Sequence, residues 1–218
     1  MTSLQGVIWD MDGVLVDTGD FHYRSWVETL KEYGIEFSHE DFRTTFGMNN
    51  EGILRMFLGE RFTEDLYSEI SDKKEQNFRR AIRGKVQLLP GVLSLLKALK
   101  SANIPQAVGS SAPSENIDAI ILELNLGSYF QILVSAASMP SKPDPAVFLS
   151  AANKLQAPAE HCLVIEDAIA GVEAAHRAGM KCLAVTTTNT DVNLQSADRI
   201  VNRLDEISIG DLISLFDR

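Results

Sequence analysis

The sequence predicts an α/β protein in which an all-helical insert interrupts a parallel sheet after its first strand. From residue 90 onward, short apolar runs alternate with amphipathic stretches, whereas residues 18–85 contain amphipathic stretches alone. The length agrees, because 218 residues lie between the size of one typical domain and that of two. We therefore expect a core formed by residues 1–17 and 86–218 and a helical domain formed by residues 18–85.

The strands are predicted from short runs rich in Val, Ile and Leu, which are typical of strands buried on both faces of a parallel sheet. Five such runs follow one another along the chain, at residues 6–10, 105–109, 131–135, 162–166 and 181–185. Because the first run precedes the insert and the other four follow it, the sheet is expected to be assembled from both flanking segments.

The helices are predicted from apolar residues that recur on one face. Three leucines share a face in residues 92–101, and three isoleucines do so in residues 116–124. Ser114 is expected to cap one helix, and Asp144 followed by a proline another. In the insert, the amphipathic stretches at 21–33 and 66–82 are expected to be helices.

Charge and cysteine content exclude several classes of partner. The formal net charge of −10 argues against nucleic acid and anionic membranes as partners. No apolar run approaches the roughly 20 residues of a membrane helix, and residues 1–5 lack the features of a signal peptide. Cys162 and Cys182 lie in apolar runs without metal-ligand spacing, as buried reduced thiols do. We expect a cytoplasmic protein, monomeric by default.

Two acids end the first predicted strand. Asp10 and Asp12 lie two residues apart, which can direct both toward the same side of the sheet edge, and Gly13 permits a sharp turn after them. Carboxylates at the end of a buried strand are costly unless something compensates their charge. A capped loop is the structural alternative at this segment.

Three further segments bring complementary groups to strand ends. Ser110 and Ser111 follow the second strand and precede a helix, so hydroxyl and backbone N–H groups meet at a position that favours anions. Lys142 lies between two prolines, and Glu166 and Asp167 end another apolar strand. Taken singly, each has a structural explanation, as a helix cap or a surface residue.

Jointly these residues predict a phosphoryl-transfer site at one edge of the sheet. Asp10, Asp12 and Asp167 are hard oxygen ligands that suit Mg²⁺ and repel one another without a cation. Ser110 and Lys142 would hold the oxygens of a phosphoryl group. One carboxylate is then available to attack phosphorus while its neighbour moves protons.

The motif Asp10-x-Asp12-Gly13, with Ser110, Lys142 and Glu166-Asp167, resembles the four motifs of the haloacid dehalogenase superfamily over nearly the whole chain. The likeness is greatest to its beta-phosphoglucomutase and sugar-phosphatase branch. It implies a Rossmann-like core with an inserted α-helical cap domain, Asp10 as a nucleophile that forms a phospho-aspartyl intermediate, and Asp12 as general acid and base. It further implies Mg²⁺ bound by Asp10, Asp12 through its main-chain carbonyl, and Asp167, with Glu166 in or near the coordination shell.

The same resemblance separates activities within the superfamily. The dehalogenase members lack an acid two residues after the nucleophile, so Asp12 favours phosphoryl transfer. The mutase uses a cap arginine to bind a distal phosphate, and Asn50 stands in its place here. Because an amide is a poor substitute for a guanidinium fork, we expect a phosphatase acting on a sugar or polyol phosphate. A phosphosugar mutase stays open as the alternative.

The insert contributes its own candidate residues. His22, Gly47, Asn50 and Lys74 are the candidate substrate residues of the cap. The structural alternatives are helix packing for His22 and a solvated helix face for the basic stretch that contains Lys74. Two other protein classes fit these residues less well: a receiver-like phosphoacceptor module, which has no such cap, and a catalytically silent binding protein, which would have lost one of the core groups.

Overall fold

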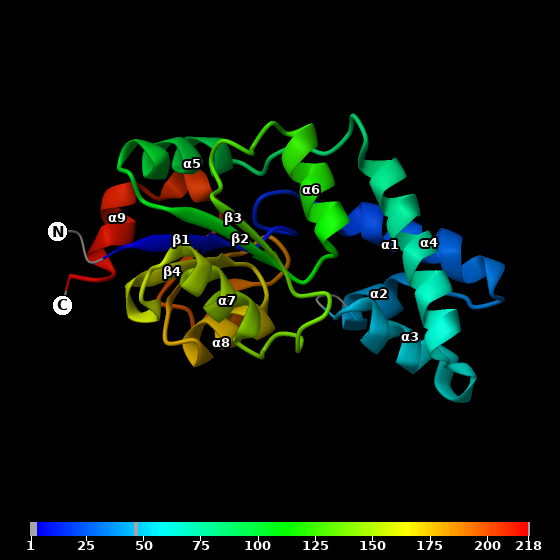
Figure 1. The fold of residues 1–218 in the computed structure, drawn as a ribbon. Helices are drawn as coiled ribbons and strands as arrows, with labels where there is room; N and C mark the ends of the chain where they lie inside the picture. Colours follow the sequence, from blue (N-terminus) through cyan, green and yellow to red (C-terminus); the bar gives the residue numbers. More distant parts are fainter. Residues whose placement is uncertain (1–3, 46–47, 218) are drawn as a thin grey trace. The chain divides into compact units, whose positions relative to one another are not determined.

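The computed structural model describes residues 4–45 and 48–217 (Figure 1). The chain divides into two compact units. Unit 1 comprises Met1–Asp17 and Gln87–Arg218, and unit 2 is the continuous segment Thr18–Val86. The second junction therefore lies one residue beyond the boundary expected from the sequence. Among the described residues, no helix combines the length and the apolar character needed to cross a membrane.

Unit 1 contains a six-stranded sheet in the order β3-β2-β1-β4-β5-β6. All neighbouring strands run parallel. This order is that of a Rossmann-like doubly wound sheet, which confirms the predicted fold class. The strands are β1 (Gly6–Trp9), β2 (Gln106–Ser110), β3 (Ile132–Ser135), β4 (Cys162–Glu166), β5 (Lys181–Val185) and β6 (Arg199–Val201).

The sixth strand was not predicted from the sequence. β6 has only three residues, and Arg199 at its start is exposed. It forms the edge of the sheet and pairs only with β5 among the described strands. A strand this short and half solvated lacks the apolar run that identifies a buried central strand.

Helices cover both faces of this sheet (Figure 1). α7 and α8 lie on one side, while α5, α6 and α9 lie on the other. Their bounds are α5 (Val92–Ser101), α6 (Ser114–Glu123), α7 (Ala146–Leu155), α8 (Ile169–Arg177) and α9 (Ile209–Ser214), with short 3-10 turns η2 (Ala159–His161), η3 (Asp191–Leu194) and η4 (Leu204–Glu206). Ile8, Val164 and Phe148 are fully buried within the core between the sheet and the α7 and α8 layer.

Two predicted helix starts shift by one residue. Ser114 is the first residue of α6 rather than its cap, and its hydroxyl donates to the side chain of Glu115. Asp144 accepts a hydrogen bond from the backbone N–H of Ala146 at 2.9 Å, and Pro145 is the N-cap of α7. Differences of one residue are expected, because the exact end of a helix is defined only to within one or two residues.

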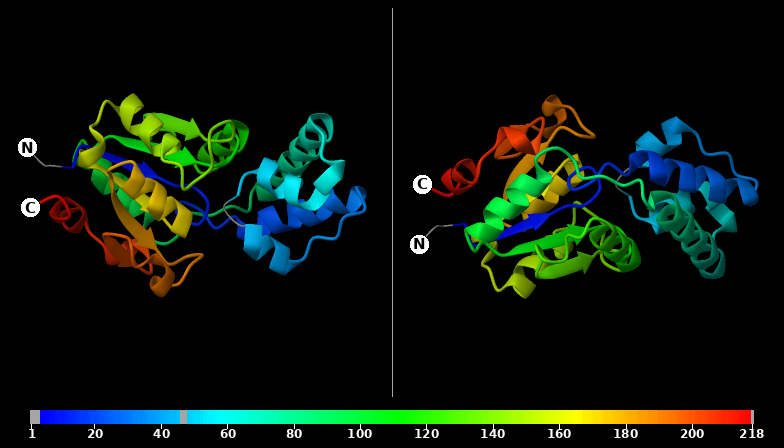
Figure 2. Two further views of the ribbon diagram at one scale, coloured as in Figure 1. Left: turned by 90° about the horizontal axis from the view of Figure 1, so that it is seen from below. Right: turned by 90° about the horizontal axis from the view of Figure 1, so that it is seen from above.

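Unit 2 is built from helices (Figure 2). Their buried apolar side chains form a core within this unit. The elements are α1 (Gly19–Glu32), α2 (His39–Thr45), α3 (Asn50–Leu58), η1 (Gly59–Arg61) and α4 (Glu64–Ile82). The amphipathic stretches expected at 21–33 and 66–82 correspond to α1 and α4, which pack against each other. Trp26, Leu54 and Ile70 are buried together in this core. Several phenylalanines of the insert belong to this core or pack against it: Phe37, Phe42, Phe57 and Phe62.

Candidate active site

The two acids of the first motif follow β1 directly. The backbone N–H of Asp10 still pairs with the carbonyl of Ile165 on β4 at 2.9 Å, so the sheet fixes the main chain of this residue. The Asp10 residue is only 7% exposed, whereas Asp12 is half-buried. Gly13 then takes a φ of +82°, which a residue with a side chain rarely adopts. The chain thus turns sharply while its first acid stays buried.

Lys142 joins the first and fourth motifs. Its Nζ donates to Oδ1 of Asp10 and to Oε1 of Glu166, both at 2.5 Å. The Lys142 side chain is 7% exposed, and its ammonium lies 4.8 Å from the centre of the Phe148 ring. Burial disfavours the ammonium, but Asp10 and Glu166 more than compensate and raise the pKa of Lys142 above its usual value. A buried cation is therefore held between two buried acids, one directly after β1 and one at the end of β4.

Asp10, the candidate nucleophile, is also affected by burial. Burial raises the pKa of Asp10 above its usual value, and the neighbouring Glu166 and Asp12 carboxylates add to that rise, although Lys142 opposes it. Burial and two neighbouring carboxylates therefore disfavour the ionised form of Asp10, and Lys142 favours it. An additional cation would stabilise its ionised form.

Glu166 organises the backbone at the end of β4. Its Oε2 accepts hydrogen bonds from the N–H groups of Asp167 and Ala168, both at 2.8 Å. Gly171 in α8 makes room for this carboxylate, because a Cβ there would lie 1.9 Å from the Glu166 carboxyl carbon. Glu166 thus contacts Lys142 and the main chain, and metal binding by its carboxylate stays a prediction.

Asp167 lies against the turn that follows β1. A Cβ on Gly13 would lie 1.9 Å from Oδ2 of Asp167, so this carboxylate packs directly against Gly13. Burial raises the pKa of Asp167 well above its usual value, and Glu166 and Asp10 add to the rise. The Thr188 hydroxyl donates to Oδ2 at 2.5 Å. Sequence reasoning missed Thr188, whose hydroxyl is one of several in a threonine-rich loop.

The sequence predicts a metal site at these acids. Within residues 4–45 and 48–217, no group of three or more His, Cys, Asp or Glu side chains is arranged to hold a metal ion. The donors that fit Mg²⁺ are the carboxylates of Asp10 and Asp167, because each is hard and buried, and burial together with neighbouring carboxylates raises the pKa of each. The main-chain carbonyl of Asp12 lies in the turn on which Asp167 packs. These residues fit a small divalent cation whose shell is completed by water and substrate oxygens.

Ser110 is the last residue of β2, the strand next to β1, and Ser111 follows it. Ser110 is 1% exposed, and its hydroxyl accepts from the backbone N–H of Ala112 at 3.1 Å. Ser111 is half-buried in the turn before α6. Ser135, paired with Ser110 in register, donates to the Ala112 carbonyl at 2.6 Å and so holds the same turn from β3. Sequence reasoning did not single out Ser135, although it ends a predicted strand.

Three of the four candidate residues of the insert form one hydrogen-bonded cluster within unit 2. Lys74 Nζ lies 2.9 Å from both Nδ1 of His22 and Oε1 of Glu75. The Asn50 side-chain amide donates to Ser71 and to the same Glu75 oxygen, each at 2.7 Å. Glu75 and Ser71 were not among the predicted residues. The fourth candidate, Gly47, lies outside the described residues.

Aromatic rings enclose the cationic end of this cluster. His22 stacks on Phe78 with the ring centres 3.9 Å apart, and the Lys74 ammonium lies 5.2 Å from the Trp26 ring centre. Lys74 is therefore buried, unlike Arg80 of the same basic stretch, which is exposed and pairs with Glu28 of α1. The stretch thus includes both a buried lysine and a solvated ion pair.

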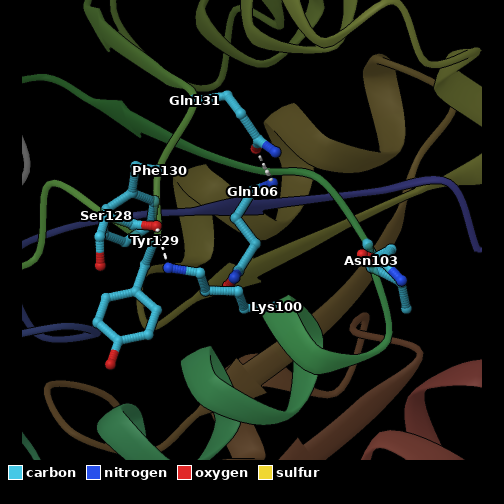
Figure 3. A pocket seen from close by; sticks show the side chains of 8 residues that line it. Lys100, Asn103, Gln106, Ser128, Tyr129, Phe130 and Gln131 are labelled. Carbon is cyan, nitrogen blue, oxygen red and sulfur yellow. Dashed lines mark hydrogen bonds between the residues drawn. The ribbon is translucent and has the colours of Figure 1, made fainter.

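A separate cavity of about 290 Å³ lies at the opposite, amino-terminal end of β2 (Figure 3). Two of its polar contacts are internal: Lys100 donates to the Ser128 carbonyl at 2.9 Å, and the Gln106 N–H donates to the Gln131 side chain at 2.7 Å. None of the candidate acids lines it. We therefore assign this cavity no part in the candidate active site.

The chain is similar in sequence and in structure to known hydrolases and mutases. A sequence model of the haloacid dehalogenase-like hydrolases matches residues 7–185. A fructose-1-phosphate phosphatase of Escherichia coli (strain K12) is 31% identical, and the alignment covers 83% of this chain and 95% of the phosphatase. The solved structure of a beta-phosphoglucomutase from Clostridium difficile is 26% identical with a TM-score of 0.88, covering 98% of this chain and 97% of the mutase.

A longer relative also contains this kind of unit. The chloroplastic protein SUPPRESSOR OF QUENCHING 1 of Arabidopsis thaliana is 33% identical over 97% of this chain. The chain spans only 21% of the length of that plant protein. This chain therefore matches one region of a much larger plant protein.

Proposed function

The chain belongs to the haloacid dehalogenase-like hydrolase family, and from this premise we propose that it is a magnesium-dependent phosphatase that acts through a phospho-aspartyl intermediate. Its substrate in this proposal is a small phosphorylated metabolite, a sugar or polyol phosphate. The observation that carries the proposal is the buried Asp10 carboxylate at the end of β1, held by the Lys142 ammonium at 2.5 Å. A nucleophile must be fixed and ionised; this contact fixes the carboxylate and favours its ionised form.

In the first step, a carboxylate oxygen of Asp10 attacks phosphorus, and the bond from phosphorus to the alcohol oxygen breaks. Lys142 and the Ser110 hydroxyl hold the non-bridging oxygens of the phosphoryl group. An ammonium has three N–H donors, so Lys142 can keep its two carboxylate partners and still bind an oxygen of the substrate. Asp12, protonated, gives its proton to the departing alcohol.

In the second step, water attacks the phospho-aspartate. Asp12, now ionised, takes a proton from the water, whose oxygen bonds to phosphorus while the bond to Asp10 breaks. Inorganic phosphate leaves and the Asp10 carboxylate is restored. The half-buried position of Asp12, two residues beyond the buried Asp10, supports this division of labour between the two acids.

Asp10, Asp167 and the Asp12 carbonyl would hold Mg²⁺. When bound, the ion offsets the negative charge that the phosphoryl group brings to a site already rich in carboxylates. Glu166 supports the same arrangement through Lys142 and through the N–H groups that it fixes beside Asp167. Chelation of divalent cations is accordingly expected to abolish turnover.

The insert favours a phosphatase over a mutase. A mutase must bind a phosphate at each end of a bisphosphate intermediate, which calls for a second cationic site. Asn50 provides an amide, and that amide donates to Ser71 and Glu75. The Lys74 ammonium is paired with Glu75. A sugar monophosphate is therefore the better match, in keeping with the named activity of the Escherichia coli relative.

The test is phosphate release from p-nitrophenyl phosphate with Mg²⁺ and with EDTA. The Asp10→Asn variant should lose about 10³-fold or more in turnover. Asp118→Asn is the matched control, because it makes the same substitution on an exposed position of α6 and should retain full activity. Equal turnover by Asp10→Asn and the wild type would refute the mechanism.

The substrate class is tested by a screen of sugar, polyol and nucleotide monophosphates, each with and without a sugar bisphosphate activator. Release of inorganic phosphate from sugar or polyol phosphates supports the proposal. An isomerised sugar phosphate that appears only with the activator would favour the mutase instead.

A further inference from the structure

The loop after β5 contacts Asp167 at both its side chain and its main chain. The Thr188 hydroxyl lies 2.5 Å from Oδ2 of Asp167 and 3.2 Å from its carbonyl oxygen. The Asn189 amide nitrogen donates to the same carbonyl at 3.0 Å and to the Thr188 hydroxyl at 3.2 Å. Two neighbouring side chains therefore bind one acid that lies 21 and 22 residues earlier in the chain.

The number of hydrogens on Thr188 and Asn189 determines which atom donates to which in this set of contacts. A threonine hydroxyl has one hydrogen to donate, and an amide NH₂ can only donate. The Asn189 amide therefore donates to the Thr188 oxygen, and the single hydroxyl hydrogen is left for Asp167. Of the two acceptors, Oδ2 is nearer at 2.5 Å than the carbonyl at 3.2 Å, and a charged acceptor makes the stronger bond.

The same oxygen also lies against the backbone of the turn after β1. A Cβ on Gly13 would lie 1.9 Å from Oδ2 of Asp167 and 3.1 Å from the Thr188 methyl carbon. Oδ2 thus lies against the turn after β1 and accepts a hydrogen bond from the loop after β5. A carboxylate confined at one oxygen presents its other oxygen in a fixed direction.

We propose that Thr188 and Asn189 are positioning residues that fix the Asp167 carboxylate for binding a divalent cation. They act through Asp167 and do not contact the cation themselves. The inference rests on the proposed function, because that proposal makes Asp167 a ligand of Mg²⁺. Partners that orient a metal ligand typically contribute 10–100-fold to metal affinity or activity.

The experiment is an isothermal titration calorimetry measurement in which MgCl₂ is titrated into the purified 218-residue chain without substrate. Thr188→Val keeps the methyl group and the volume but removes the hydroxyl, and it should weaken Mg²⁺ binding by about 10–100-fold. Thr188→Ser keeps the hydroxyl and should bind Mg²⁺ nearly as tightly as the wild type. Rescue by serine separates the hydroxyl bond from methyl packing.

A second variant tests the inference even if Thr188→Val does not fold. Asn189→Ala removes the donor that directs the Thr188 hydroxyl, and it should weaken Mg²⁺ binding to a value between those of the wild type and Thr188→Val. Thermal unfolding in EDTA identifies any variant whose fold is damaged. Wild-type Mg²⁺ affinity in Thr188→Val, or equal weakening in Thr188→Val and Thr188→Ser, would overturn the inference.

The two proposals fail in different ways. A wild type that binds Mg²⁺ but releases no phosphate from any substrate contradicts the phosphatase proposal, while the calorimetric comparison still decides the role of Thr188. Phosphate release with undiminished Mg²⁺ affinity in Thr188→Val contradicts the inference alone. A wild type that does not bind Mg²⁺ contradicts the inference as well.

Discussion

At the scale of single residues, the ammonium of Lys142 holds two buried carboxylates that would otherwise face each other unscreened. It donates to Asp10 and Glu166 at 2.5 Å and is itself buried. Breaking a buried ion pair by removing one partner costs more than the pair contributes, because the remaining charge is left without compensation. Lys142 is therefore a structural residue of unit 1 as well as a candidate phosphate ligand.

Lys142→Met should lower the free energy of unfolding by about 3–5 kcal/mol in EDTA at neutral pH. The double variant Lys142→Met/Glu166→Gln should recover part of that loss, because it removes one of the two uncompensated carboxylates. Urea unfolding of the wild type, both single variants and the double variant gives the coupling directly. An unchanged urea midpoint for Lys142→Met would contradict the charge argument.

Within α8, Gly171 illustrates a close approach that only glycine permits. A Cβ at this position would overlap the Glu166 carboxylate, which is held by Lys142 and by two backbone N–H groups and so cannot move freely. Helix propensity alone would favour alanine by about 1 kcal/mol. The steric conflict is expected to outweigh this preference.

Gly171→Ala should therefore destabilise the protein by about 1–3 kcal/mol and reduce phosphate release. Gly210→Ala in α9 is the matched control, because a Cβ at Gly210 would lie at an ordinary 3.6 Å from the nearest atom, the Ser208 hydroxyl oxygen. The control should be neutral or stabilising by up to about 1 kcal/mol. If both glycine variants shift the thermal midpoint alike, the Glu166 contact does not require glycine.

In α4, Glu75 connects the candidate residues of the insert. Burial alone would raise the pKa of Glu75, but Lys74, His22 and the hydrogen bonds from Lys74 and Asn50 lower it below the usual value. A carboxyl with a lowered pKa stabilises the fold above its unfolded-state pKa, near 4.5, and this stabilisation is lost as the pH falls through the folded-state value.

Glu75→Gln should accordingly cost about 3 kcal/mol of unfolding free energy at pH 7, and the deficit should shrink toward pH 3. Asp72→Asn, at an exposed position of the same helix, should change stability by less than about 0.5 kcal/mol at both pH values. Urea unfolding followed by far-ultraviolet circular dichroism measures both. A deficit independent of pH would mean that the Glu75 charge contributes nothing.

Particular elements show how far sequence reasoning reaches. β1 and β4 were predicted because strands buried on both faces require continuous apolar runs, and the acids that follow them stand out against that pattern. β6 was missed because its three residues carry no such pattern. Thr188 and Glu75 were missed for another reason: their partners depend on loop curvature and helix rotation, which apolar periodicity does not encode.

At the scale of the whole molecule, the chain passes between its two units twice, once after Asp17 and once after Val86. Gly84 lies near the second junction with a φ of +67°, and a Cβ there would meet no atom within 4 Å. Substrate-induced movement of one unit requires that junction residues change their backbone angles. Gly84 is therefore a candidate hinge residue.

Gly84→Pro tests this role, because proline locks φ near −65° and cannot adopt the observed angle. We expect kcat and KM for a sugar phosphate to change together, with the thermal unfolding of unit 1 preserved. Gly34→Pro is the matched control: Gly34 has a φ of +70° and equally open surroundings and also lies in unit 2, but far along the chain from either junction. Both variants force a residue with a positive φ toward −65°, so a kinetic effect confined to Gly84→Pro identifies the junction as the cause. Kinetics that change equally in the two variants would instead assign the effect to damage within unit 2.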